Sequence, residues 1–175
     1  IKQRRLVEKL LDFVTEARTS WERDWGRFVG HEAAASSLSN DEVDAKVLSP
    51  RDYRELVLPR ERKLADHYRE GISYFHSCGN ITPFLTDIAG IRGMKMVHVS
   101  PWTDMKAAIK TLDSRLTLQR WIHPEDLILG EEEARARFSH ILEEGSGRRM
   151  LIVCAGAVKD TVRWLQAVKP VMDMK

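Results

Sequence analysis

Apolar residues near the start of the chain recur at steps of three and four, which is the spacing of one face of an α-helix. The pattern predicts an amphipathic helix that ends near Gly26 and packs onto a sheet through its apolar stripe. The short apolar run at 27–31 predicts a first strand, and the small and polar residues at 32–48 predict a long loop after it. The stripe comprises Leu6, Val7, Leu10, Leu11, Val14, Ala17 and Trp21.

A second helix carries its own start signal. Ser49 is followed by Pro50 and, three residues on, by Asp52, which places a capping residue, a first-turn proline and a first-turn acid in order. Apolar spacing continues this helix to Tyr68. Pro59 lies inside the pattern and should kink the helix, because proline has no N–H to donate and its ring displaces a backbone carbonyl.

From residue 71 onward, strand patterns alternate with helix patterns, which predicts parallel β/α units and an α/β fold in one domain over residues 1–175. An open doubly wound sheet is one arrangement of such units, but no glycine-rich phosphate motif follows the first strand. We favour a (β/α)8 TIM-barrel type, of which this chain would supply about five of the eight units. The later strands are predicted at 72–78, 94–100, 116–122 and 149–156, with helices beginning near 82, 103, 130 and 160.

The composition and the distribution of charge argue against a protein that binds nucleic acids or membranes. The 175 residues are 43% hydrophobic and 31% charged, as in a folded protein with a core, and the 28 basic and 26 acidic residues form no block that predicts a nucleic-acid or membrane surface. The sequence shows no signal peptide and no apolar run long enough to cross a bilayer, so we expect a reducing cytoplasm with two free or metal-bound cysteines. The chain begins inside a helical pattern, and we expect it to be part of a longer protein.

Three side chains with metal-ligand chemistry stand at predicted strand ends. His76 and Cys78 point to the same side because side chains alternate along a strand, and Cys154 stands at the matching end of the last strand. Ligands and catalytic groups collect at the carboxyl ends of parallel strands. Two sulfurs and one imidazole suit zinc with a fourth position open, although buried cysteines also serve as small apolar residues and a core histidine is commonly just hydrogen-bonded.

Two segments carry a resemblance to a known family. "LSPRDYRELVLP" at 48–59 and "FHSCGNITPFL" at 75–85 resemble the uroporphyrinogen decarboxylase superfamily, and within it the zinc-dependent, corrinoid-linked methyltransferases. The resemblance implies that the chain is the C-terminal portion of a β/α barrel. In the methyltransferase branch it further implies zinc ligands at His76, Cys78 and Cys154. A carboxylate would complete the site; we favour Glu32, at the end of the predicted first strand, with Asp41 in the following loop as the alternative.

Other polar and aromatic residues at or just after predicted strand ends are candidates for a substrate pocket, although each is also a common rim or core residue. Their positions follow from the same β/α pattern that places the metal ligands. The candidates are Asn80, His98, Trp102, Trp121 and His123.

The resemblance implies methyl transfer between a small molecule, such as a thiol, methoxy or methylamine compound, and a corrinoid (methylcobalamin) carried by a partner protein. Zinc and that corrinoid would be the cofactors. A tetrapyrrole decarboxylase is the first alternative, but the arginine-rich segment that holds its substrate is absent and "WIHPED" at 121–126 replaces a turn common in relatives. The second alternative is a non-catalytic truncated barrel or scaffold, which could form a homodimer through its open edges.

Overall fold

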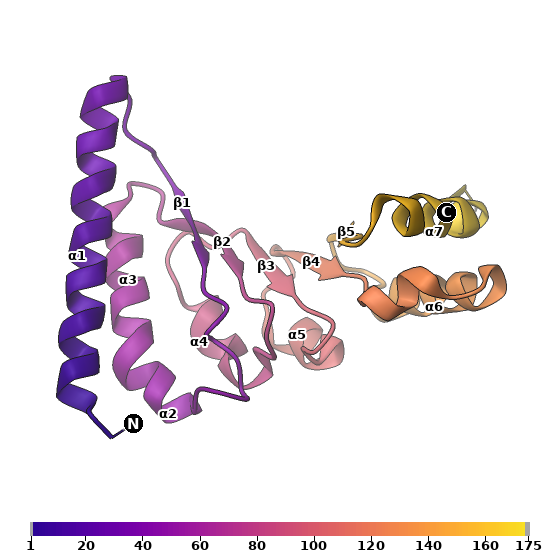
Figure 1. The fold of residues 1–175 in the computed structure, drawn as a ribbon, viewed down its shortest axis with the longest axis horizontal. Helices are drawn as coiled ribbons and strands as arrows, with labels where there is room; N and C mark the ends of the chain where they lie inside the picture. Colours follow the sequence, from indigo (N-terminus) through magenta and orange to yellow (C-terminus); the bar gives the residue numbers. More distant parts are fainter. Residues whose placement is uncertain (1, 174–175) are drawn as a thin grey trace.

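The computed structural model describes residues 2–173, which form a five-stranded sheet with helices between the strands (Figure 1). All neighbouring strands are parallel, and their order across the sheet is the same as their order along the chain. A doubly wound sheet reverses its strand order at a switch point, whereas a barrel keeps it sequential. The strands are β1 (Ser36–Ser39), β2 (Ile72–His76), β3 (Met96–Val99), β4 (Thr117–Trp121) and β5 (Met150–Val153). The predicted partial barrel is confirmed.

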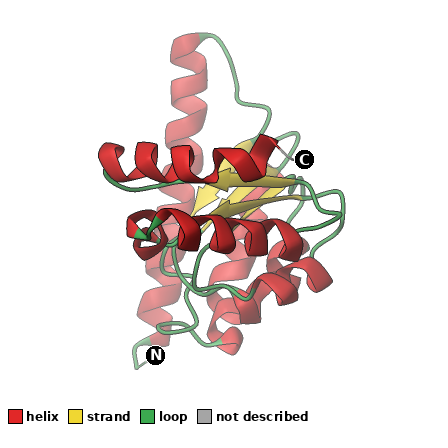
Figure 2. Ribbon diagram, turned by 90° about the vertical axis from the view of Figure 1, so that its right-hand side faces the viewer, coloured by secondary structure: helices red, strands yellow, loops and turns green. Residues whose placement is uncertain are grey.

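Helices connect every pair of consecutive strands, and Figure 2 shows them beside and below the sheet. Between β1 and β2 one long helix is divided by a π-helical turn, and 3-10 turns precede the helices that follow β2 and β4. The elements are α1 (Arg4–Val29), α2 (Pro50–Asp52), η1 (Tyr53–Val57), α3 (Leu58–His67), η2 (Thr82–Phe84), α4 (Leu85–Ala89), α5 (Met105–Thr111), η3 (Pro124–Ile128), α6 (Glu131–Glu144) and α7 (Val158–Asp173).

The predicted first strand at 27–31 is wrong. This run continues α1 to Val29, where Gly30 ends the helix with a φ of 72°, a left-handed conformation that glycine adopts at little cost. The true first strand, β1, lies inside the predicted loop. Its sequence is Ser-Ser-Leu-Ser, in which Leu38 is the one buried side chain, so the usual apolar signal of a strand is missing.

The divided helix follows its sequence signals. Ser49 Oγ accepts a hydrogen bond from the Asp52 N–H at 3.0 Å, as a helix cap should. Pro59 has no N–H, and the turn just before it widens to π geometry, in which the Leu58 N–H donates to the Tyr53 carbonyl. The predicted kink is therefore present as a π turn over Tyr53–Val57.

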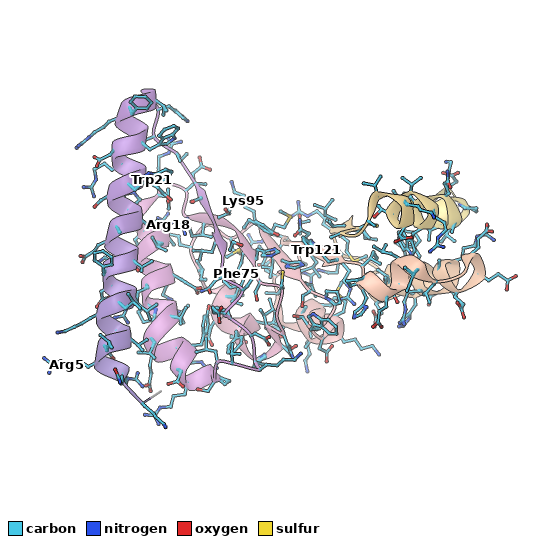
Figure 3. The ribbon with its side chains drawn as sticks, in the orientation of Figure 1. Arg5, Arg18, Trp21, Phe75, Lys95 and Trp121 are labelled. Atoms are coloured by element: carbon cyan, nitrogen blue, oxygen red, sulfur yellow. The ribbon has the colours of Figure 1, made fainter. Side chains whose placement is uncertain are left out.

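The core has two parts. The larger part includes residues of β1 to β4 and of the helices that pack on them, and it contains Phe75 of β2, labelled in Figure 3, whose side chain is fully buried. The smaller part joins α6 and α7, where Phe138 and Trp164 meet edge to face with ring centroids 5.4 Å apart. Met150 of β5 packs against both parts and links them.

Apolar side chains that face solvent gather at the two ends of the sheet. The apolar stripe of α1 does not pack onto the sheet as predicted: Trp21 is 63% exposed and Leu10 is 58% exposed. Phe13, another apolar residue of α1, is 67% exposed. At the other end, β5 and α7 expose Leu151, Val158, Val162, Leu165 and Met172. In a closed barrel of eight units, neighbouring β/α units would cover both ends of this sheet. Within residues 2–173, no helix is both long enough and apolar enough to span a bilayer.

Removing the Phe75 side chain should destabilise the fold strongly, because the cavity would lie in the centre of the larger core. We expect Phe75→Ala to lower the free energy of unfolding by about 3–5 kcal/mol. Ile128→Ala, at a position that is 63% exposed, should change it by less than about 0.5 kcal/mol. Urea unfolding followed by circular dichroism measures both, and equal effects of the two substitutions would contradict this description of the core.

Candidate metal centre

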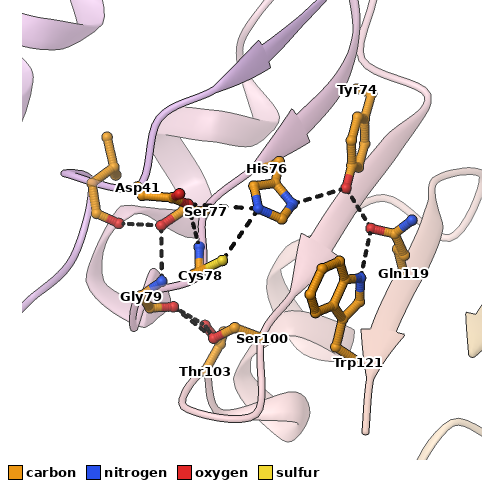
Figure 4. A network of polar contacts seen from close by, with 11 residues as sticks. Asp41, Tyr74, His76, Ser77, Cys78, Gly79, Ser100, Thr103, Gln119 and Trp121 are labelled. Carbon is orange, nitrogen blue, oxygen red and sulfur yellow. Dashed lines mark hydrogen bonds and ion pairs between the residues drawn. The ribbon is translucent and has the colours of Figure 1, made fainter. Parts of the chain in front are cut away.

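The site begins with two side chains at the end of β2. His76 is the last residue of the strand, and Cys78 follows two positions later (Figure 4). Cys78 Sγ lies 3.3 Å from His76 Nε2, so the predicted alternation does bring the two side chains together. The His76 side chain is 14% exposed, and Cys78 is exposed, so a small molecule can reach this end of the sheet.

Asp41 joins this pair from the loop that follows β1. Its Oδ1 accepts a hydrogen bond from the Cys78 backbone N–H at 2.8 Å and lies 3.5 Å from His76 Nε2. The ligand atoms of Asp41, His76 and Cys78 all lie within 4.8 Å of one another. One carboxylate oxygen, one imidazole nitrogen and one sulfur are the donor types that zinc binds, so the three residues fit that ion.

The loop that carries Asp41 is fixed to the end of β2 by several hydrogen bonds. The Asn40 N–H donates to the His76 carbonyl at 2.9 Å, and Ser77 Oγ donates to the Val43 carbonyl at 2.9 Å. Gly79 lies so close to the loop that a Cβ there would meet Asp44 Cβ at 2.4 Å. The glycine of "HSCGN" therefore allows the two segments to approach.

A second group of side chains orients His76. Tyr74 O–H donates to Gln119 Oε1, which also accepts from Trp121 Nε1 at 3.2 Å. With its proton used in this way, the Tyr74 oxygen accepts from His76 Nδ1–H, 3.1 Å away. This tautomer leaves the Nε2 lone pair directed toward Cys78 and Asp41, which is the arrangement of a metal-binding histidine.

His98 covers the other side of the His76 ring. The two rings are stacked with centroids 4.3 Å apart and an interplanar angle of 6°. His98 is fully buried, and neither of its nitrogens has a hydrogen-bond partner among the described residues. Burial, followed by the neighbouring His76, lowers the pKa of His98 from 6.5 to about 4, so this side chain is neutral at physiological pH.

The charges at the site favour a cation. Burial and the Asp41 carboxylate raise the pKa of the Cys78 thiol, because a thiolate beside a carboxylate is repelled. The hydrogen bond from the Cys78 N–H is the main cause that lowers the pKa of Asp41. A bound divalent ion would relieve the repulsion and favour the thiolate.

The two other predicted ligands lie elsewhere. Cys154 does follow β5, but β5 is three strands from β2 in the sheet, and the Cys154 side chain packs against the smaller core. The ligand atoms that converge belong to Asp41, His76 and Cys78. Glu32 precedes β1 instead of following the first strand, because the real strand begins later than predicted. It lines a hollow of about 920 Å³ together with residues of α1. The structure places the alternative, Asp41, beside His76.

The predicted pocket residues divide into two groups. His98 and Trp121 lie beside His76, with the Trp121 ring centroid 5.5 Å from that of His76. Trp102 and His123 form a separate edge-to-face pair, 4.6 Å between centroids. Asn80 is half-buried and shapes the turn after β2, since its Oδ1 accepts from the Thr82 N–H at 3.0 Å.

Sequence reasoning missed Tyr74 and Gln119. Tyr74 stands two residues before His76 and therefore on the same side of β2, which is a signal that the alternation rule already contained. Gln119 is a polar residue within a predicted strand, and such a side chain needs a partner when it is partly buried.

The buried neutral His98 should make stability depend on pH. The unfolded chain protonates this side chain below pH 6.5 and the folded chain only near pH 4, so stability should be lost as the pH falls between these values. The loss attributable to His98 should be on the order of 3 kcal/mol. Urea unfolding with a chelator present should show a flatter pH dependence for His98→Leu than for the wild type, and an equally steep dependence in this variant would contradict a buried neutral His98.

Comparisons with known proteins agree with this architecture. A solved methyltransferase from Methanosarcina mazei has a similar structure, with a TM-score of 0.69 and 22% sequence identity over 99% of this chain and 51% of that chain. This chain thus spans about half the length of that methyltransferase. A comparison with curated proteins finds no match. The family model described as Uroporphyrinogen decarboxylase (URO-D) matches residues 1–158, and the chain therefore belongs to this family.

Proposed function

We propose that this chain is the metal-binding half of a zinc-dependent methyltransferase, with Asp41, His76 and Cys78 as ligands. The observation that carries the proposal is the convergence of their oxygen, nitrogen and sulfur atoms within 4.8 Å at the carboxyl ends of parallel strands. Tyr74 supports it by holding His76 with Nε2 facing the other two ligands. The similar fold of a protein described as a methyltransferase is a further support.

The chemistry follows from the ligand set. Zinc in such a site holds an incoming thiol as a thiolate near neutral pH, which makes the sulfur a good nucleophile for a methyl group. The small molecule would bind at the exposed side of Cys78, and a corrinoid carried by a partner protein would exchange the methyl group with it. The two free cysteines suit a reducing cytoplasm.

Methyl transfer is a better match to this site than tetrapyrrole decarboxylation. A decarboxylase that holds several substrate carboxylates needs converging guanidinium groups, since arginine binds carboxylates in a bidentate manner. The side chains that converge here are instead metal ligands. Arg120 of β4 donates from Nη1 to the Ser100 carbonyl at 2.7 Å.

Metal analysis tests the proposal directly. We expect mass spectrometry of the purified protein to show one zinc per chain. Cys78→Ser should weaken zinc binding by more than roughly tenfold, because even the loss of a residue that only hydrogen-bonds to a metal ligand typically lowers metal affinity that much. Cys154→Ser is the matched control and should keep the zinc. A folded wild-type protein that binds no zinc would contradict the proposal. Loss of zinc in Cys154→Ser would contradict the proposed ligand set and favour the one implied by the family resemblance, in which Cys154 is a ligand.

We also propose that two copies associate through the ends of the sheet. The exposed apolar side chains of α1 lie at one end and those of β5 and α7 at the other, so two copies related by a two-fold axis can bury both ends at once. Arg18 Nη2 donates to the Ser37 carbonyl at 3.0 Å and so occupies part of the β1 edge. The contact would therefore depend mainly on the helices.

Light scattering during gel filtration should give about twice the chain mass of 20.1 kDa. The double substitution Phe13→Lys and Trp21→Lys should yield monomers, because it places charges among the exposed apolar side chains of α1. Arg23→Ala, at another exposed position of α1, should leave the dimer intact. A wild-type protein that is monomeric at micromolar concentration would contradict the proposed association.

A further inference from the structure

One carboxylate of the molecule is buried without a cation. Glu61 of α3 is 3% exposed, and its two oxygens accept hydrogen bonds from Tyr53 O–H at 2.6 Å and from Asn40 Nδ2 at 3.1 Å. No basic side chain of the described chain forms an ion pair with it. Burial of a carboxyl group costs free energy that a leucine at this position would avoid, so its retention calls for a role other than stability.

The π turn is what aligns Tyr53 with Glu61. In a regular α-helix, residues eight positions apart are turned by about 800°, which leaves their side chains about 80° apart around the axis. A π turn adds one residue to the helix, so the effective separation falls to about seven residues and the angle to about 20°. Pro59, through the turn that precedes it, thus puts both side chains on one buried face.

This face meets the loop of the candidate metal centre. Asn40, whose side chain donates to Glu61, uses its backbone N–H to donate to the His76 carbonyl at 2.9 Å. The next residue is Asp41, which accepts from the Cys78 N–H. A continuous chain of contacts therefore runs from α3 through one asparagine to both sides of the site.

We propose that Glu61 is a positioning residue of this centre: it fixes Asn40, and through Asn40 it holds Asp41 in place to bind metal together with His76 and Cys78. This inference rests on the proposed metal site. The hydrogen bonds of Glu61 are with Tyr53 and Asn40 and not with the three proposed metal ligands, so its effect is on the geometry of the loop. The contacts that carry it are those of Tyr53 and Asn40, which occupy both carboxylate oxygens.

Two substitutions of Glu61 distinguish the effect of its hydrogen bonds from the effect of filling its space in the core. Glu61→Leu fills the space and removes both hydrogen bonds, so we expect zinc affinity, measured by competition with a chromophoric chelator, to fall roughly 10–100-fold. Glu61→Gln can still accept from Asn40 through its carbonyl and donate to Tyr53 through its amide, and it should restore most of the affinity. Leu64→Ala, one turn further along α3, is the control for a general loss of stability.

A second readout needs no metal. In the metal-free protein, Glu61→Leu should speed hydrogen exchange of the Cys78 amide, which donates to Asp41, and Glu61→Gln should not. Unchanged zinc affinity and unchanged exchange in Glu61→Leu would overturn the inference, as would equal losses in Leu64→Ala. If the wild type binds no zinc, the proposed function fails, and the exchange measurement still decides whether Glu61 holds the loop.

Discussion

The parallel pairing of β1 with β2 is the interaction on which the candidate centre depends. It sets Ser39 opposite His76, so that the loop leaving β1 and the turn leaving β2 emerge side by side. Only this register brings a carboxylate from one segment against a histidine and a cysteine from the other. A slip by one residue would turn the side chains of β1 to the opposite face.

This pairing is also the part of the fold that the sequence does not predict, because β1 is not recognisable from its own residues. From β2 to α7 the elements lie close to their predicted places, because strand patterns and helix patterns alternate regularly along this part of the chain. β1 is short, rich in serine and stabilised by its neighbour, so its own residues carry little strand signal. The apolar end of α1 was mistaken for a strand because Phe28 and Val29 favour either structure.

The misplaced first strand also affects the prediction of the metal ligands. His76 and Cys78 belong to one strand end, and alternation along a single strand was enough to predict that they meet. The carboxylate that completes the predicted set depends on where another strand ends, and the predicted strand at 27–31 favours Glu32, which lies at the opposite end of β1 from Asp41. Cys154 was placed at the correct end of β5, but strand order says nothing about how far a partial sheet curves.

The π turn of the divided helix also has a consequence for how this segment can vary in length. Deleting one residue within 53–57 would return the helix to regular α geometry, at little cost to its backbone hydrogen bonds. It would also leave the residues after the deletion facing nearly the same way relative to Tyr53, because seven residues of a regular α-helix turn through about 700°, which keeps the angle at about 20°. A deletion of one residue in this turn is therefore compatible with the buried face of the helix, whereas an added residue that no further π turn absorbs would rotate that face by about 100° away from the loop above it.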